Sequence, residues 1–299
     1  MNVFVAGGSG AIGMPLVRAL VSAGSQVTAM TRSNEKARQL RALGASVAVA
    51  DALDREAIMR AVEDAHPTHV VHELTALPKD APRRARDLDA TNRLRVDGTR
   101  NLLEAAINAG ARRLVVGSFA ILADRGQPAA DAASAAVHSM EQQTLEATHR
   151  RSIEGVILRY GMFYGVGLPS TDAMIEMVRR RRLPIVRGDQ GQLPFVQIDD
   201  AVCATVLALD KAPAGSVYDI VDDHSASFAE VVTTLSEYTQ SPHPLRVPAW
   251  LPRLVAPYLA RITAVRMPLS NAKAKAELGW QLKYPNFREG LAPLLKRAA

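Results

Sequence analysis

Short apolar runs alternate with helix-like segments along the first 160 residues of this 299-residue chain. The runs predict strands at residues 2–6, 26–30, 46–50, 68–72, 113–118 and 154–160, and a seventh at 216–221. The segments between them are amphipathic, most clearly at 14–24 and 99–111, and both of these contain a glycine that can end a helix. Strands rich in Val, Ile and Leu that are separated by helices favour a parallel sheet covered on both faces.

After residue 160 helical segments predominate, around 171–182, 199–210, 227–239, 250–262 and 287–297. Prolines cluster between 242 and 268 and indicate bends. We therefore predict an α/β protein with a Rossmann-type, doubly wound parallel sheet of about seven strands and a smaller, mostly helical C-terminal lobe for the substrate. Residues 1–165 would form the sheet domain, to which the chain returns at about 190–222. Residues 166–189 and 223–299 would form the lobe.

Composition narrows the class of partner. The mean hydropathy is -0.01, and no apolar run approaches the roughly 18 residues of a membrane-spanning helix. A single cysteine cannot form an internal disulfide, which favours the cytoplasm. The formal charge of +6 suits nucleic acid or an anionic small ligand, but no aromatic residues interleave with the densest basic run, 178–184. We expect a small-molecule substrate, no nucleic acid and no membrane.

The stretch "VFVAGGSGAIG" places three glycines between the first strand and the first helix. Glycine permits a tight turn, close approach of a pyrophosphate and close packing of helix on strand. The N-terminus of the helix then offers free N–H groups to the phosphates. The stretch predicts a dinucleotide-binding loop. The turn around Ser9 also resembles a nucleophile elbow, but a hydrolase elbow follows several strands rather than the first.

The end of the second strand, "TAMTRSNEK", discriminates between two cofactors. NAD usually requires an acidic residue here for the ribose 2′-hydroxyl, whereas NADP requires a cation for the 2′-phosphate. Arg32 and Ser33 occupy this place, and the first acid is Glu35. A guanidinium binds phosphate bidentately, so the sequence predicts NADP, with NAD as the alternative and a plain surface role for Arg32 still open.

Several further segments have one family in common: residues 7–13, 49–54, 96–118, 158–167, 195–201 and 271–280. In this order they resemble the extended short-chain dehydrogenases/reductases of the NAD(P)-dependent epimerase/dehydratase group, over nearly the whole chain. The resemblance implies a seven-stranded Rossmann sheet, a cofactor along its carboxyl edge, a substrate lobe that closes over the nicotinamide, and a homodimer.

The resemblance also implies contacts to the cofactor, with Asp51 at the adenine ring and residues 72–77 at the nicotinamide ribose. The predicted cofactor-binding residues are Gly7, Gly10, Ala11, Ile12, Gly13, Arg32, Ser33, Asp51, Ala52, Leu74, Thr75, Ala76, Gln142 and Tyr160. No metal site is predicted, because His69 and His72 are three residues apart on a strand and face opposite sides.

The chain departs from the family where the family does its chemistry. The family uses a serine after the fifth strand and a Tyr-x-x-x-Lys helix, in which the lysine lowers the pKa of the tyrosine. Here Tyr160 is the first tyrosine in the chain, and no lysine lies between Lys79 and Lys211. The motif is therefore absent from the helix expected at 134–150.

Aligning Glu146 with the family's glutamate places His138 at the tyrosine and Gln142 at the lysine. The serine falls on Ser118 or on Phe119, and the family's helix asparagine falls on Arg95, with Asn92 one turn earlier. The imidazole of His138 can serve as acid or base, but a polar helix residue without a catalytic role explains it equally well.

We predict catalytic roles for His138, Tyr164 and Ser118. The leading hypothesis is an NADP(H)-dependent oxidoreductase that acts on a small or medium organic carbonyl, alcohol or enone by hydride transfer with a non-standard proton donor. The alternatives are a cofactor-binding sensor or scaffold without turnover, and a non-redox isomerase or lyase with His138 as base. Epimerisation at C4 of a sugar nucleotide is disfavoured, because it depends on the missing tyrosine.

Overall fold

The structure is a computed structural model that describes residues 1–78, 82–188 and 191–294. Its centre is a parallel sheet of seven strands in the order β10-β6-β5-β4-β1-β2-β3. The strands are β1 (Asn2–Ala6), β2 (Gln26–Thr31), β3 (Ser46–Val49), β4 (His69–His72), β5 (Arg113–Phe119), β6 (Glu154–Tyr160) and β10 (Val217–Ile220). All seven predicted strands form this sheet, which confirms the predicted fold class.

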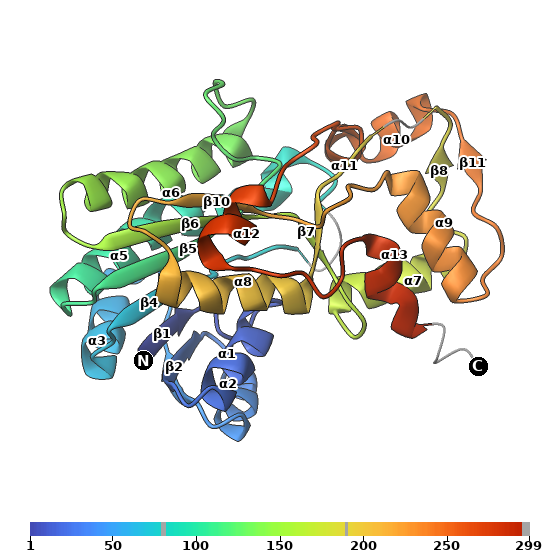
Figure 1. Cartoon of the computed structure of the whole chain (residues 1–299). Coiled ribbons are helices and arrows are strands. Elements are labelled where there is room, and N and C mark those ends of the chain that lie inside the picture. Colours follow the sequence, from blue (N-terminus) through green and yellow to red (C-terminus); the bar gives the residue numbers. More distant parts are fainter. Residues whose placement is uncertain (79–81, 189–190, 295–299) are drawn as a thin grey trace.

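Helices cover both faces of the sheet (Figure 1). One layer holds α1 (Gly13–Ser22), α2 (Asn34–Ala42), α8 (Ile198–Lys211) and α12 (Ala272–Leu278). The other holds α3 (Arg55–Ala65), α5 (Thr99–Asn108) and α6 (Ala132–His149). Successive strand residues point to opposite layers, with Val3 and Val5 on the α8 face and Phe4 and Ala6 on the α6 face. Burial on both faces explains why the strands are apolar throughout.

A continuous but irregular helical segment leads into α5. It begins with a 3-10 turn, η1 (Ala85–Leu88), and continues as α4 (Asp89–Arg93) and a π-helix, η2 (Leu94–Gly98). Single π-turns of this kind are rare and occur mostly at functional sites.

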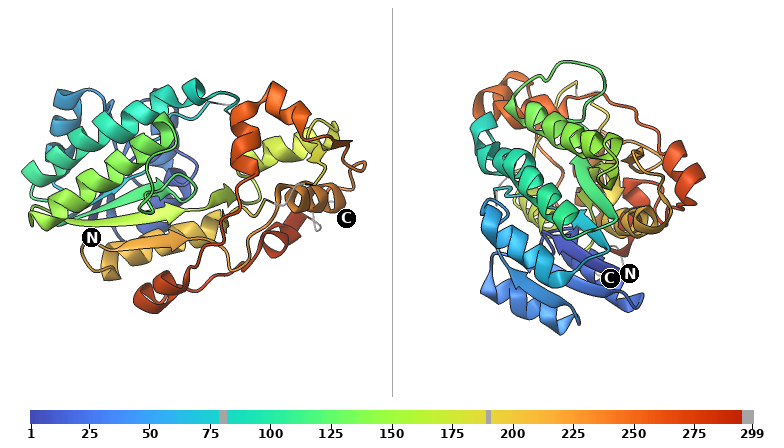
Figure 2. Two further views of the ribbon diagram at one scale, coloured as in Figure 1. Left: turned by 90° about the horizontal axis from the view of Figure 1, so that it is seen from above. Right: turned by 90° about the vertical axis from the view of Figure 1, so that its left-hand side faces the viewer.

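The remaining elements form a lobe beyond the carboxyl ends of the strands (Figure 1, Figure 2). The helices of the lobe are α7 (Pro169–Arg179), α9 (Phe228–Tyr238), α10 (Trp250–Val255), α11 (Pro257–Thr263), α13 (Phe287–Leu291) and the 3-10 turn η3 (Ala292–Leu294). Two strand pairs complete it, β7 (Met162–Tyr164) with β9 (Phe195–Gln197) and β8 (Ile185–Val186) with β11 (Arg246–Val247). In the part of the chain that the structure describes, no helix is long and apolar enough to cross a membrane.

The lobe differs from the sequence prediction in three places. The helix expected at 250–262 is two helices, because Pro257 cannot continue α10 and the backbone of Ala256 leaves the helical region. The chain that returns near 195 pairs with β7 in a separate two-stranded sheet before β10 joins the main sheet. The helix expected at 287–297 ends as an α-helix at Leu291, and its last predicted residues, 295–297, lie outside the described residues.

Candidate active site

A cleft opens at the carboxyl edge where the strand order reverses, between β1 and β4. In an open parallel sheet, such a switch point is where ligands bind. The residues that line the cleft are Gly7, Ser9, Gly10, Met30, Thr31, Arg32, Ser33, Lys36, Asp51, Ala52, Glu73, Leu74, Thr75 and Leu94. Eight of these residues are among the predicted cofactor contacts.

The glycine loop has no room for side chains. Gly7 has a φ of +89°, and a Cβ there would collide with the backbone of Glu73. A Cβ on Gly13 would collide with the carbonyl oxygen of Gly7. A pyrophosphate can therefore approach the start of α1 closely, where the first N–H groups of a helix have no partner within the helix. Of the other loop residues, Ala11 is exposed and Ile12 is buried beneath the turn.

Exposed cations form the rim of the cleft at the end of β2. The hydroxyl of Ser33 accepts a hydrogen bond from the Lys36 backbone N–H at 3.3 Å and caps α2. This cap turns Lys36 back over the glycine loop, where its Nζ donates to the Ser9 carbonyl at 3.4 Å. The Nη1 atom of Arg32 lies 3.7 Å from Oδ2 of Asp51 across the cleft. Lys36 was not predicted from the sequence. Its place as a cation at the third position of the helix after β2 was the available signal.

On the α8 face, a buried carboxyl group lies beside the cleft. Glu73 follows β4, and its side chain fills the space above Gly117 that a Cβ would occupy. The hydroxyl of Tyr160 donates to Glu73 Oε1 at 3.0 Å and lies 2.7 Å from the Thr205 hydroxyl. Burial raises the pKa of Glu73 to about 8, although the Tyr160 hydrogen bond opposes the shift. Burial therefore favours the protonated form of Glu73.

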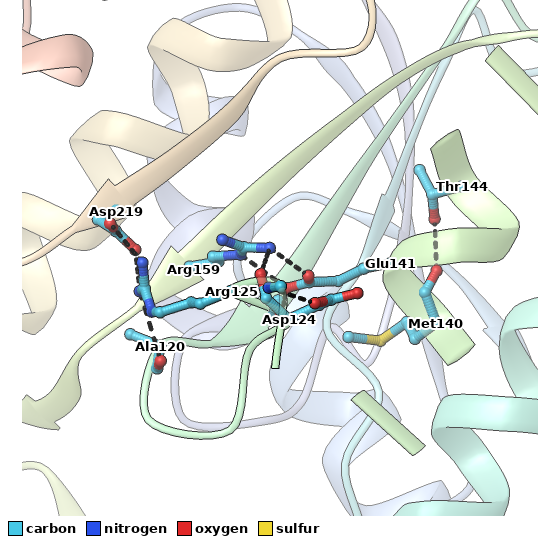
Figure 3. A network of polar contacts seen from close by, with 10 residues as sticks. Ala120, Asp124, Arg125, Met140, Glu141, Thr144, Arg159 and Asp219 are labelled. Carbon is cyan, nitrogen blue, oxygen red and sulfur yellow. Dashed lines mark hydrogen bonds and ion pairs between the residues drawn. The ribbon is translucent and has the colours of Figure 1, made fainter. Parts of the chain in front are cut away.

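On the α6 face, β5, β6 and α6 meet at a buried ion pair (Figure 3). Arg159 donates from Nε and Nη2 to the two carboxylate oxygens of Glu141, at 3.0 and 2.6 Å. Ser118, predicted as a catalytic hydroxyl, donates to Glu141 Oε1 at 2.6 Å. The Glu141 side chain is only 3% exposed. The hydroxyl of Ser118 is therefore bound to this ion pair. Neither the composition nor the motifs of the sequence had indicated the ion pair.

Two arginines also hold the loop between β5 and α6 (Figure 3). Arg159 donates to the Asp124 carbonyl at 2.6 Å. Arg125, from the loop itself, binds both carboxylate oxygens of Asp219 on β10, at 2.6 and 3.2 Å. The loop is thereby fixed to the strand next to β6. A charged residue within a buried strand, such as Arg159 in "EGVILRY", was the available signal, because a buried charge requires a partner.

The predicted catalytic helix is α6, and it contains neither tyrosine nor lysine. His138 is half-buried, and within the part of the chain that the structure describes its imidazole makes no hydrogen bond or ion pair. Gln142 is exposed, and its amide donates to Glu146 Oε1 at 3.0 Å along the same helix. Ala76, another predicted contact, donates its N–H to the Thr91 hydroxyl at 3.1 Å.

Tyr164, the third predicted catalytic residue, lies in the core of the lobe. Its side chain is fully buried, and its hydroxyl donates to Asp222 Oδ2 at 2.8 Å and to the Asn286 carbonyl at 3.0 Å. Gly290 leaves the space for its ring. Both contacts of the phenol are therefore made within the core of the lobe.

The doubly wound sheet, the glycine cradle and the cationic rim together define a dinucleotide-binding protein. Residues 3–221 match the NAD dependent epimerase/dehydratase family, and the chain belongs to that family. The NAD(P) cofactor and the Rossmann sheet are typical of its members.

Among proteins of known function, the chain is 36% identical to a 3-diazoavenalumate denitrifying reductase of a Streptomyces species, over 97% of this chain and 99% of that protein. It is 27% identical to 4-hydroxy-2-methyl-3-oxo-4-farnesyl-3,4-dihydroquinoline-1-oxide ketoreductase of Stigmatella aurantiaca, over 100% of this chain and 85% of the relative. These relatives are reductases. Among solved structures, Thermus thermophilus UDP-glucose 4-epimerase in complex with NAD is similar in fold, with a TM-score of 0.80 and 24% identity, covering 100% of this chain and 99% of that one.

Proposed function

We propose that this protein is an NADP(H)-dependent reductase of a small or medium organic electrophile, and that it works without a tyrosine proton donor. The observation that carries the proposal is the combination of an intact dinucleotide cradle with a helix α6 that has no tyrosine and no lysine. In addition, the nearby hydroxyl of Ser118 is bound to the Glu141–Arg159 pair.

The chain's own residues fit the cofactor at two points. The backbone of the glycine loop, kept bare by Gly7 and Gly13, would hold the pyrophosphate. Arg32 and Lys36 would hold the 2′-phosphate. When bound, the dinucleotide supplies hydride.

As substrate class we propose aromatic or conjugated diazo compounds. The relative that is 36% identical over nearly its whole length is named for reducing a diazo compound with loss of nitrogen. In such a reduction a carbon–hydrogen bond replaces the carbon–nitrogen bond, dinitrogen leaves, and a quinone diazide takes up one hydride and one proton to become a phenol. No alkoxide forms at the reacting carbon, so a tyrosine of lowered pKa is not required there.

Reduction of a ketone or enone is the second candidate. It is favoured by relatives named as a ketoreductase and as a 2-alkyl-3-oxoalkanoate reductase, each 27% identical. A carbonyl oxygen takes up a proton as hydride arrives, and His138 is a half-buried titratable side chain of α6 that has no partner among the described residues. This route assigns His138 the role of general acid.

The test is turnover of NADPH deuterated at C4 with an ortho-quinone diazide, an aryl ketone and an enone, followed by mass spectrometry of the products. We expect deuterium at the former diazo carbon, together with release of dinitrogen. The matched control is the double variant R32E/K36E, which changes two exposed side chains and should lose NADPH binding but keep the fold.

Equal rates with the parent and the control would mean that the reduction occurs in solution, and would contradict the proposal. Labelled alcohol from the ketone alone would instead establish the second candidate. NADPH binding without turnover of any substrate would favour a sensor. Isomerisation or elimination without NADPH consumption would favour a lyase.

A further inference from the structure

Arg95 is a buried cation to which the described residues offer no anion. It lies on the π-helix η2 and is only 8% exposed. Its one side-chain hydrogen bond is a long one, 3.4 Å from Nη1 to Oδ1 of Asn92. No carboxylate of the described residues forms an ion pair with it. Buried arginines are almost always paired, so this one is exceptional.

Another buried arginine of the same protein shows what a structural role looks like. Arg113, 7% exposed, binds Glu154 Oε2 from Nε and Nη2 at 3.0 and 2.7 Å. Its Nη1 donates to the carbonyls of Ala208 and Leu209, both at 3.0 Å. All three nitrogens of the Arg113 guanidinium donate hydrogen bonds to protein oxygens, whereas Arg95 makes a single hydrogen bond, to the neutral amide of Asn92.

Arg95 lies between the carboxyl edge of the sheet and the lobe. Its charge contributes to lowering the pKa of His72, at the end of β4, and acts in the same direction on Tyr258 of α11. The segment before it is tied to the same helix, because the Tyr258 N–H donates to the Arg83 carbonyl at 3.1 Å. Leu94, the preceding residue, lines the cofactor cleft. The cation is therefore next in the chain to a residue of the cofactor cleft, and it acts electrostatically on a residue of the lobe.

A cluster of buried apolar side chains includes Tyr258, the residue of the lobe on which this cation acts. Tyr258 packs in a cluster with Leu88, Leu122, Ala133 and Val137, which come from η1, the β5–α6 loop and α6. Val137 precedes His138 on α6. A ligand that suits both features has an apolar, flat body and one anionic end.

We propose that Arg95 binds the carboxylate of the substrate, and that the substrates are therefore aromatic or conjugated carboxylic acids. A planar guanidinium binds a carboxylate through two parallel hydrogen bonds. The guanidinium of Arg261, 5.1 Å from the centre of the Tyr258 ring, is paired with Asp131, so Arg95 offers one unpaired positive charge, which suits a group of charge −1. The inference rests on the proposed function only in treating the ligand as the substrate.

The test measures binding rather than turnover, so it stands or falls independently of reductase activity. Protein saturated with NADP⁺ is titrated with cinnamate and with cinnamamide, its neutral analogue of the same shape. We expect cinnamate to bind about ten- to hundredfold more tightly than the amide. Arg95→Met should abolish this preference, and Arg95→Lys should retain part of it. Arg93→Met, an exposed arginine of the same segment, is the matched control and should bind as the parent does.

Stability without the ligand gives a second readout. Removal of a buried charge that has no protein counter-ion should leave the melting temperature of Arg95→Met equal to that of the parent or higher. A clear fall would mean that the guanidinium has a structural partner and would overturn the inference. So would equal binding of the two probes, binding of neither, an unchanged preference in Arg95→Met, or inorganic phosphate that competes as well as cinnamate.

Discussion

The two ends of the sheet's carboxyl edge are built differently. At the cofactor end, which comprises Gly7, Gly13, Arg32 and Lys36, bare backbone and exposed cations face the cleft. At the reaction end, around Ser118, Glu141 and Arg159, charged side chains are buried and bound to one another. Dinucleotide binding needs few side chains, and they are close in sequence. The other end depends on contacts between β5, α6 and β6, which join residues that are far apart in sequence.

We expect the largest loss of stability when the buried ion pair of Glu141 and Arg159 is broken, which tests the comparison of the two ends directly. Glu141→Leu leaves Arg159 charged without its partner, and Arg159→Met leaves Glu141 in the same state. Each should lower the free energy of unfolding by about 3–5 kcal/mol, measured by urea unfolding. The double variant should recover much of this loss, because two apolar side chains replace two charges. Small, additive losses would mean that the pair contributes little and that the two ends are alike in their energetics.

The second effect concerns Glu73, which adjoins the cleft and carries a raised pKa of about 8 against its ordinary value of 4.5. The unfolded chain ionises this carboxyl above pH 4.5, whereas the folded protein keeps it protonated to about pH 8. The contribution of this group to the free energy of unfolding is therefore complete below pH 4.5 and falls by roughly 5 kcal/mol as the pH rises to 8. Asp222, with a pKa also raised by burial to about 8, adds a slope of the same sign.

Glu73→Gln should remove the share of Glu73 in that slope. We expect the variant and the parent to be similar in stability at pH 4.5, and the variant to be the more stable at pH 8, by urea unfolding at both values. The remaining slope combines Asp222 with other shifted groups, among them His69 and His72, whose lowered pKa values make stability rise with pH between about 4 and 6.5. Parallel curves for the two proteins would show that Glu73 is ionised in the folded protein.

The contrast between the two ends also explains which parts of the fold and of the candidate site could be predicted from the sequence. The seven strands and the glycine loop follow from local patterns, and each was found within one or two residues of its observed bounds. The contact of Ser118 with Glu141, and that of Tyr160 with Glu73, join residues 23 and 87 positions apart. No local pattern encodes such pairs. Tyr164 was predicted as catalytic because it follows β6, but the burial of its hydroxyl against Asp222 depends on how the lobe folds.

At the cofactor end a smaller effect is expected. Arg32→Ala and Lys36→Ala should each weaken NADPH binding about ten- to hundredfold, because in the proposed function each side chain would form a charge-assisted hydrogen bond to the 2′-phosphate. NADH binding should change little, and so should stability, because both side chains are exposed. Fluorescence titration with both cofactors measures this. Arg38→Ala, an exposed arginine of α2 that does not line the cleft, is the matched control. Equal losses for NADPH and NADH would contradict the assignment of NADP.

With the diazo substrate, we expect the smallest change in rate from substitution of His138. The size of this change separates the two candidate reactions. If hydride replaces a diazo group, the proton goes to the oxygen on the neighbouring ring carbon and can come from water, so His138→Gln should lower kcat only a few-fold. If the substrate is a ketone, the proton is needed at the reacting carbonyl, and the same change should lower kcat by a factor of about 10²–10⁴.

Single-turnover rates of parent and variant with an ortho-quinone diazide and with an aryl ketone, each at several pH values, measure these two losses. A loss above about hundredfold with the diazide would assign proton transfer to His138 in that reaction as well. The reaction end would then retain an acid on α6, and its difference from the family's usual chemistry would be the identity of that acid rather than its absence.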